Sequence, residues 1–509
     1  MSNRAFLFPC RRAAPFLLCC GFALAPPLGA ADSPQDGNFD RSFNTVPSWN
    51  GAPGWATIPF DPSGRTPRDT ALGVRMLLDG TMIIGGLAGR DRLDDNNGLL
   101  AAVRLNSDGT PSSFWASPED LRGGTQPGRI TWPYMYDFFT MTPAGMNPGG
   151  NEGVGFAGSG RVTIGTNINR AKYFSVSPSG TTLNGGLGTC ELYAGGALRN
   201  FFALGASTRY YDSAVIAGYV RRYGDQAYLE ANCELTRNQV RTRTVPDTLP
   251  STPAGVIGAV SIMPHYVTAD ATVYSRRLFR NFNSAADNDV ELCEPGYNYT
   301  VTPPTPYTNC SVFQPNVGGH LDDLLFSVVP TYGGFTTGLI ESQAESSPGG
   351  GDDRRVLTIA RPRVYGVNAT GDVYERDSQL RTYQLGDATT PASSLSFHSP
   401  IGVFDGRNGT TLWVVMALRP FPGANEYREI AVARFKYYDL SLDTRFGNGT
   451  GWRRYSLGGA EVMPNAVVLD NQGRLVIAGT RRYNPDTDDW DFFVMRINDD
   501  VLFQDKFGD

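Results

Sequence analysis

The sequence is poor in the residues that most often carry metal-dependent or nucleophilic chemistry. Its 509 residues include three histidines and seven cysteines, and among its 44 basic residues only Lys172, Lys436 and Lys506 are lysines. No Cys-x-x-Cys, His-Glu-x-x-His, Gly-x-Ser-x-Gly or phosphate-loop pattern occurs. A zinc site, a metalloprotease, a serine-hydrolase elbow and a nucleotide site are therefore not indicated. Local motifs predict no catalytic residue and no cofactor.

Long apolar runs are missing beyond the N-terminus. Residues 1–31 are typical of a secretory signal, because Arg4, Arg11 and Arg12 precede an apolar core and small residues follow it. That core is too short to span a membrane. We therefore expect an exported, soluble protein, secreted or periplasmic, that does not insert into a membrane.

Positive charge is also in deficit, and the formal net charge is −6. An acidic chain is a poor partner for nucleic acid or an anionic membrane. We expect a monomer whose partner is a protein or a glycan, neither of which the sequence identifies.

Glycine and proline are abundant, at 59 and 35 residues, as a fold of many short strands requires. The segment 442–509 opens with Leu-Asp-Thr-Arg-Phe-Gly and closes with Asp-Lys-Phe-Gly. Between them lie short β-branched or aromatic runs at 465–469, 475–478 and 491–497, separated by turn residues. This pattern predicts strands throughout.

The same unit recurs elsewhere in the chain. Gly80–Gly86 matches Gly473–Gly479 position for position, Phe39-Asp40-Arg41-Ser42-Phe43 resembles the opening at 442, and 411–417 begins a third copy. Four strands of such a unit form a sheet that cannot bury both faces alone. Stacking the sheets face to face solves this, as in a β-propeller.

These elements resemble the delta-60 repeat family, a bacterial exported β-repeat that is expected to form propellers. The shared pattern is a Leu-Asp-x-x-Phe-Gly start, an Asp-Gly turn before an apolar strand ending in Gly, and an apolar-Arg-apolar strand. The match covers 39–114 and 411–509, and the starting motif is missing between them. The resemblance implies a propeller, but no activity and no catalytic residues.

The strand spacing predicts an all-β fold, a single propeller at 32–509 with about seven four-stranded blades, or eight if two units are hidden in the middle. Insertions are expected at about 115–160 and 293–310. A ring must join its ends, so the first strand of the mature chain should complete the sheet of the last strands, near 492–497. Phe43 and Phe507 should be buried anchors.

The first insertion is rich in aromatic residues. They could form a platform for a sugar or a peptide. Alternatively, Trp132–Phe139 is a blade strand that packs inward, and we favour this interpretation. The second insertion is a tyrosine- and proline-rich loop between two cysteines.

Four cysteines remain after export: Cys190, Cys233, Cys293 and Cys310. An even number in an exported protein predicts disulfides, and the sequence alone allows three pairings. Pairing of neighbours, Cys190 with Cys233 and Cys293 with Cys310, is the simplest.

Asp486, Asp488 and Asp491 could hold a calcium ion through carboxylate oxygens. Acids recur in the corresponding loop of the first copy, at 91–95. Turn chemistry explains them equally well and is preferred, because the Gly and the distant Glu of an EF-hand loop are missing.

Two classes of function remain open. The absence of catalytic motifs favours a non-enzymatic exported propeller that binds a protein or glycan. The alternative is a propeller hydrolase or lyase that acts on polysaccharide, with acids from several blades in the central channel. His320, beside Asp322 and Asp323, is the histidine with the closest acids, and a solvated loop residue is the favoured interpretation.

Overall fold

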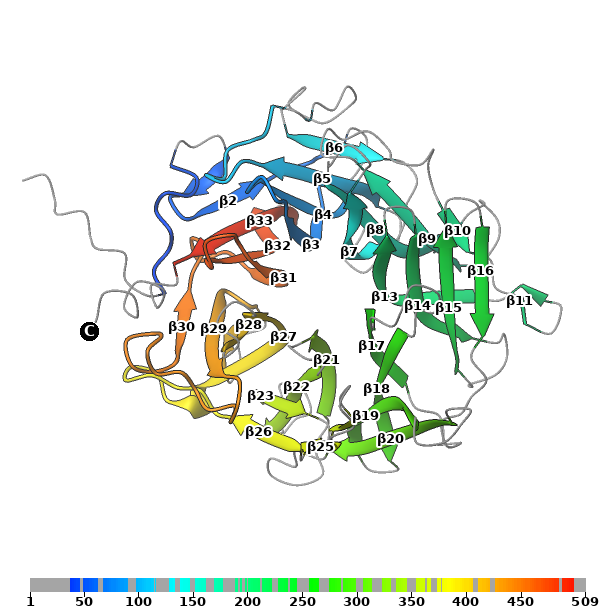
Figure 1. The fold of residues 1–509 in the computed structure, drawn as a ribbon. Helices are drawn as coiled ribbons and strands as arrows, with labels where there is room; N and C mark the ends of the chain where they lie inside the picture. The colour runs from blue at the N-terminus through cyan, green and yellow to red at the C-terminus, as the bar shows by residue number, and fades with distance from the viewer. Residues whose placement is uncertain are drawn as a thin grey trace, which may run out of the picture.

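The computed structural model describes residues 37–498 with gaps in the loops, and it describes side chains mainly in 37–132 and 323–498. The sheets are arranged around a central opening as the blades of a β-propeller (Figure 1). Among the described residues there is no α-helix, and the 3₁₀ helix η2 spans Ala392–Ser394. No helix in this part of the chain is long and apolar enough to cross a membrane.

Six of the described sheets have four antiparallel strands, and a seventh has five. In the first half the four-stranded sheets are β3 (Thr70–Met76), β4 (Met82–Ala88), β5 (Leu99–Leu105) and β6 (Arg129–Trp132); β7 (Phe138–Met146), β8 (Glu152–Arg161), β9 (Asn169–Val176) and β10 (Gly188–Cys190); and β13 (Asn200–Tyr210), β14 (Ser213–Arg221), β15 (Tyr228–Thr236) and β16 (Gln239–Thr244).

In the second half they are β17 (Val256–Pro264), β18 (Tyr274–Ser284), β19 (Asp287–Asn298) and β20 (Thr305–Phe313); β21 (Asp323–Pro330), β22 (Thr336–Glu345), β23 (Arg354–Arg361) and β26 (Gln379–Tyr383); and β27 (Leu395–Asp405), β28 (Thr411–Pro420), β29 (Glu429–Lys436) and β30 (Trp452–Tyr455). The small hairpins are β11 (Tyr193–Ala194) with β12 (Ala197–Leu198), and β24 (Val364–Val367) with β25 (Val373–Arg376).

The five-stranded sheet joins the two ends of the described chain. Its order is β31 (Val462–Leu469), β32 (Leu475–Asn484), β33 (Asp489–Ile497), β2 (Trp55–Ile58) and β1 (Asn50–Ala52). Strand β2 pairs antiparallel with β33, with Trp55 opposite Met495 and Ile58 opposite Phe492. The predicted closure of the last sheet by the first strand is confirmed.

The second strands β4, β28 and β32 are apolar on both faces over most of their length, because a sheet packs on either side of them. Every residue of β4 is buried, and in β32 Leu475–Ala478 are fully buried. Alternate residues of β32 enter different cores: Val476 packs with β3–β5, and Ile477 packs with β28 and β29. The apolar runs that marked the repeats therefore mark the middles of blades.

The sequence repeat and the sheet are offset by one strand. The segment after the Leu442 start forms β30, which is the fourth strand of the preceding sheet. The last sheet receives its own fourth strand, β2, from the start of the chain. This offset forces the ring to close through both ends.

The starting motif anchors the fourth strand of two sheets through a buried ion pair. Leu442 bridges Phe435, and Asp443 pairs with Arg434 at 3.1 Å. The equivalent contacts at the other end of the chain are Phe39 with Ile497 and Asp40 with Arg496 at 2.7 Å. Phe43 is fully buried, as predicted, whereas Phe507 lies outside the described residues.

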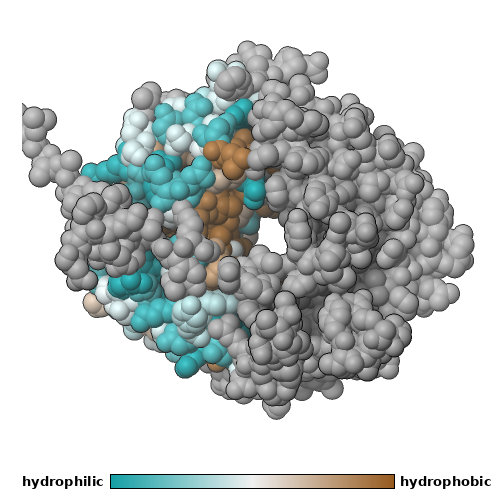
Figure 2. All heavy atoms as spheres, viewed as in Figure 1, coloured by the Kyte–Doolittle hydropathy of each residue, from teal (hydrophilic) through white to brown (hydrophobic). Residues whose placement is uncertain are grey.

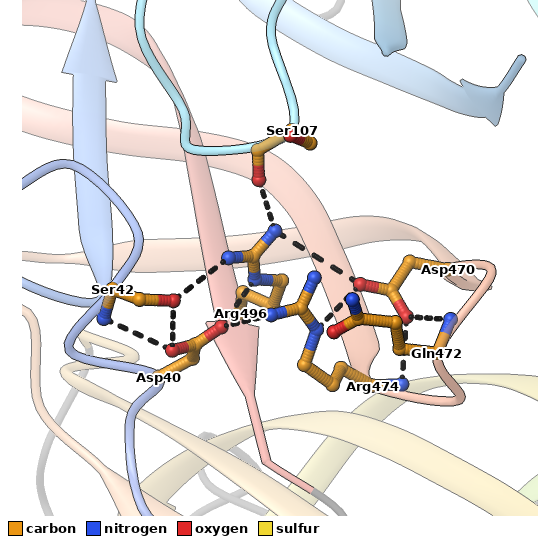
Figure 3. A network of polar contacts seen from close by, with 7 residues as sticks. All are labelled: Asp40, Ser42, Ser107, Asp470, Gln472, Arg474 and Arg496. Carbon is orange, nitrogen blue, oxygen red and sulfur yellow. Dashed lines mark hydrogen bonds and ion pairs between the residues drawn. The ribbon is translucent and has the colours of Figure 1, made fainter. Parts of the chain in front are cut away.

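Figure 3 shows the second of these anchors in full. Asp40 accepts hydrogen bonds from Ser42 and pairs with both Arg496 and Arg474, at 2.7 and 2.8 Å. Arg496 also donates to the carbonyl of Ser107, which lies in the turn after β5 of the next sheet. Burial alone would raise the pKa of Asp40, but the hydrogen bond from Ser42 and the two arginines outweigh it and lower the pKa.

A third copy of the motif is present at 111–129, where the sequence had not revealed it. Pro111 bridges Leu105, as Leu442 bridges Phe435, and Ser112 takes the place of the aspartate. Arg104 lacks that acid and pairs instead with Asp79 at 2.8 Å. Arg129, which opens β6, takes the place that Trp452 has at the start of β30.

Strands occupy much of 115–160. Trp115 and Trp132 are buried and pack edge to face, with ring centroids 6.3 Å apart. Trp132 is therefore part of the core, as predicted, but the prediction of one strand over Trp132–Phe139 is wrong, because β6 ends at Trp132 and β7 begins at Phe138 in the next sheet.

The cysteine predictions fall on residues whose side chains are not described. Strands β19 and β20 place Cys293 directly opposite Cys310 in backbone register. Cys190 lies in β10 and Cys233 in β15, which belong to different sheets. Both pairings stay predictions.

Candidate functional site

A group of carboxylates lies where the last sheet meets the first. Asp61 and Asp69 belong to the connection from β2 to β3, and Asp489 and Asp491 lie at the start of β33. Arg68 forms a parallel bridge with Trp490, which brings the two segments together. Strand β33 is the third strand from the central opening, and Asp69 directly precedes β3, the first strand of its sheet, so the group lies at the seam between the last sheet and the first.

The described part of the channel wall is apolar. Figure 2 shows a hydrophobic surface beside the opening. The first strands of the described sheets carry half-buried apolar side chains that pack against the cores, such as Leu72, Val467 and Phe404, and Leu324 and Phe326 of β21 are about two-fifths exposed. The enzyme hypothesis expected a cluster of acids in the channel. In the described part of the chain, the acids that cluster lie at the seam between the last sheet and the first.

Asp69 is fully buried and fixes the connection through backbone amides. Its Oδ2 accepts hydrogen bonds from the N–H groups of Phe60 at 2.7 Å and Asp61 at 3.3 Å, and its Oδ1 accepts one from Gly89 at 2.9 Å. Burial raises the pKa of Asp69 to about 7, and these donors offset only part of that effect.

Asp491 is the most isolated member of the group. Its side chain is 2% exposed, and its Oδ1 has no hydrogen-bond partner. One carboxylate oxygen from each of Asp61, Asp69 and Asp491 lies within 4.8 Å of the others. Burial, followed by the charge of Asp69, raises the pKa of Asp491 well above its ordinary value.

Asp489 and Asp61 form the part of the group that reaches solvent, since both are half-buried. Burial and then the charge of Asp61 raise the pKa of Asp489 to about 6. Asp61 has a backbone φ of 38°, a left-handed conformation that aspartate tolerates better than most residues. Asp489 therefore keeps its proton up to about pH 6 and lies in a half-buried position.

The nearest cation does not bind these acids. Arg129 is fully buried, and its guanidinium donates to the carbonyl of Pro59. Its Nε and Nη2 have no hydrogen-bond partner. Burial lowers the pKa of Arg129, and the charges of Asp69 and Asp61 oppose that effect from a distance. The acid group is thus left without a direct positive partner from Arg129.

A chain of ion pairs runs away from the acids along the same ends of the strands. Arg68 pairs with Asp488 at 2.5 Å, and Arg482 lies 3.7 Å from Asp488 and 3.6 Å from Glu461. Arg482 also reaches Glu426 at 3.9 Å, in the loop after β28. The chain spans three neighbouring sheets and gives this face a hydrophilic, charged surface.

The three residues of the predicted calcium site, Asp486, Asp488 and Asp491, do not come together in one group. Asp486 lies outside the described residues, as do the acids at 91–95. Asp488 bonds to Arg68 and accepts from Trp490 Nε1 at 2.8 Å, and these hydrogen bonds lower its pKa against the opposing effect of burial. Asp491 alone joins an acid group, with Asp61 and Asp69 instead of its predicted partners.

Sequence reasoning also missed a buried histidine network. His398 Nε2 lies 2.8 Å from Ser396 Oγ, and His398 Nδ1 lies 3.2 Å from Glu341 Oε1. The order resembles a catalytic triad, but Ser396 is fully buried and its Oγ already accepts the N–H of Arg355. We interpret the network as structural, because its hydrogen bonds hold β27 against β22 and β23. His320 lies outside the described residues.

No protein-family model matches the chain, and no curated protein does. Among solved structures, it is similar to the GH93 α-L-arabinofuranosidase of Fusarium graminearum, with 14% identity, a TM-score of 0.41, and coverage of 87% of this chain and 97% of that one. The α-L-arabinanase of Penicillium chrysogenum gives 12% identity, a TM-score of 0.40, and coverage of 88% and 98%. The polysaccharide lyase Uly1 gives 11%, 0.41, and coverage of 91% and 97%.

These similarities correct the leading functional prediction. The non-enzymatic binding module is wrong as first choice, because the similar structures are of enzymes: an arabinofuranosidase, an arabinanase and a polysaccharide lyase. At this low identity and TM-score they say nothing of the chemistry here. Any chemistry proposed for this chain must therefore rest on the residues at the seam.

Proposed function

We propose that the chain is a propeller enzyme that cleaves a polysaccharide, and that Asp489 delivers the proton to the departing sugar. The observation that carries this proposal is a half-buried carboxyl, beside three others, whose pKa is raised to about 6. Such a group is protonated below about pH 6, and its half-buried position leaves it within reach of a substrate. Cleavage of a glycosidic bond needs this kind of general acid.

The surrounding charge favours hydrolysis over elimination. Hydrolysis passes through a transition state in which the sugar carries positive charge, and Asp61 lies close enough to shift the pKa of Asp489. Nearby carboxylates stabilise that positive charge. Elimination builds negative charge on the sugar, which the same acids would oppose.

The charged face supports an extended hydrophilic substrate. The ion pairs from Glu426 through Arg482 and Asp488 to Arg68 lead along three sheets toward the acids. Exposed charged groups of both signs can exchange their mutual contacts for hydroxyl groups of a sugar chain. A polysaccharide lying along this face would pass Asp489.

The proposal is tested by incubating the purified protein with neutral and uronate-containing polysaccharides. We expect new reducing ends without the ultraviolet absorbance of an unsaturated product, because that absorbance marks elimination. Activity should fall as pH rises above about 6, since Asp489 then loses its proton. Absence of cleavage across the whole panel contradicts the proposal.

Asp489→Asn removes the proton donor and should reduce turnover by roughly 10²–10⁴-fold. The matched control is Asp439→Asn, because Asp439 lies in an exposed turn and bonds only to Ser441 among the contacts described. Full activity of Asp489→Asn would show that another group is the acid.

We also propose that the ring has seven blades, with the five-stranded sheet as the blade that closes it. The six four-stranded sheets and the β31–β33 sheet support this number. An experimental structure of the purified protein tests it, and an eighth radial sheet would contradict it.

Export and the disulfides remain proposals of the same kind. The signal-like segment 1–31 supports an exported protein, and the register of Cys293 opposite Cys310 supports a disulfide between β19 and β20. Peptide mapping without reductant should recover that pair from periplasmic or secreted material. Free thiols at both positions would contradict it.

A further inference from the structure

Three of the seam acids have the geometry of a cation site. The oxygens of Asp61, Asp69 and Asp491 lie within 4.8 Å of one another. Calcium binds oxygen ligands at about 2.3–2.6 Å, so two ligands of one ion lie up to roughly 5 Å apart. The group therefore encloses a space of the right size for one calcium ion.

A second feature of Asp491 points to a ligand. This side chain is buried to 98%, its Oδ1 has no hydrogen-bond partner, and its carboxylate reaches the other two acids. Burying a polar atom without a partner is costly, and the polar atoms of native proteins are rarely left so. A bound cation would satisfy this oxygen.

Asp69 is oriented for the same task. A carboxylate offers about four lone-pair positions on its two oxygens. Three backbone N–H groups donate to those of Asp69. At least one position is left for a cation. The amide donors also favour the ionised carboxylate and hold it in place, as hydrogen bonds around metal ligands commonly do.

The neighbouring arginine does not fill the role of the cation. Arg129 makes no hydrogen bond to the three acids, and its Nε and Nη2 have no partner. Arg481, the other positive neighbour of Asp491, donates its Nε to the carbonyl of Leu457. Arg129 therefore does not occupy the space between the carboxylates through a hydrogen bond.

We propose that Asp61, Asp69 and Asp491 bind a divalent cation of the calcium class at the seam between the last and first sheets. Because its ligands come from the two ends of the ring, the ion would tie the β2–β3 connection to β33. Calcium is preferred to magnesium, because calcium tolerates irregular oxygen geometry whereas magnesium requires a nearly ideal octahedron. The inference concerns binding and does not depend on the proposed cleavage.

The test is calorimetric titration of chelator-treated protein with CaCl₂ and with MgCl₂, accompanied by thermal unfolding. We expect one saturable site for calcium, a melting temperature that rises with calcium, and at least tenfold weaker magnesium binding. Affinity should be lower at pH 5 than at pH 8, because the acids must release protons to bind the ion. No heat and no thermal shift at millimolar calcium would overturn the proposal.

Two variants locate the site. Asp491→Asn should weaken calcium binding at least tenfold, and Asp61→Asn, at a half-buried position, gives the same readout if the first variant folds poorly. Asp488→Asn is the matched control, because Asp488 bonds to Arg68 and lies outside the group. Loss of binding in Asp488→Asn with retention in both other variants would overturn the assignment. These binding measurements fail or succeed separately from any loss of cleavage.

Discussion

Two sets of buried acids hold the ends of this ring, and they differ in their partners. Asp40 lies between Arg496 and Arg474, and its pKa is lowered although burial opposes this. Asp69 has only amide donors, and its pKa is raised to about 7 by burial. Both contact the sheet that contains β33, so burial alone does not decide the charge of a carboxyl group. Its nearest partner does.

The difference separates a structural site from one with reactive potential. The Asp40 set recurs at Asp443 with Arg434, which lie before β30 as Asp40 lies before β2. The Asp69 set is found at one seam of the described chain, and two of its members reach solvent. Functional sites often retain groups whose pKa values are unfavourable for stability.

The largest expected effect comes from removing the positive partner of Asp40. Arg496→Met should cost about 3–5 kcal/mol of unfolding free energy, because a buried carboxylate loses its main ion pair. Denaturant unfolding at pH 7 measures this. A loss below about 1 kcal/mol would mean that Arg474 replaces Arg496, and that the paired acids need only one arginine.

A smaller effect should appear as a pH dependence set by Asp69. Its folded pKa of about 7 exceeds the ordinary 3.8, so its contribution to stability is complete below pH 3.8 and is lost as the pH rises to about 7. Between pH 4 and pH 7 this loss is about 3 kcal/mol. Unfolding of the chelator-treated protein should show it, and Asp69→Asn should lack it. Equal pH dependence in both would show that the amide donors keep Asp69 ionised.

The same substitution should have opposite signs in the two sets. Asp40→Asn should destabilise by about 1–3 kcal/mol, because it breaks charge-assisted bonds to two arginines. Asp491→Asn should stabilise the cation-free protein at pH 8 by roughly 1 kcal/mol, because it removes a buried, repelled charge. Paired unfolding curves in chelator measure both. Destabilisation by both substitutions would erase the distinction.

The smallest effect belongs to an exposed pair on the charged face. Arg428 pairs with Glu426 at 2.6 Å, but its side chain is 62% exposed. Arg428→Ala should change the unfolding free energy by less than about 1 kcal/mol, because solvent screens such pairs. A loss comparable with that of Arg496→Met would mean that burial does not separate the two classes.

The strands were predictable where both faces of a strand are buried. The runs at 475–478 and 491–497 form parts of β32 and β33, and ring closure predicted the pairing of β2 with the segment near 492–497. The offset between repeat and sheet was not predicted, because β30 and β2 have four residues each and their sequences do not show which neighbouring strand they join.

The acid group could not be found in the sequence, because its members come from the two ends of the chain. The contact between Arg68 and Asp488, which lies beside the group, spans 420 positions. The third starting motif was also missed, because Ser112 and Arg129 replace the aspartate and the tryptophan that would have marked it. Finding the acid group from the sequence would have required knowledge of which strands are neighbours.

The pairing of β2 with β33 has a consequence for how the protein is made. The chain emerges from the ribosome in order, so Trp55–Ile58 is available long before Phe492–Met495 exists. That early strand can pair with β1 at once, but its other edge must wait for β33 while the intervening sheets fold, and the contact with β33 is distant in sequence. The final sheet acts as a check on completeness, because a chain truncated before β33 leaves both ends of the ring open.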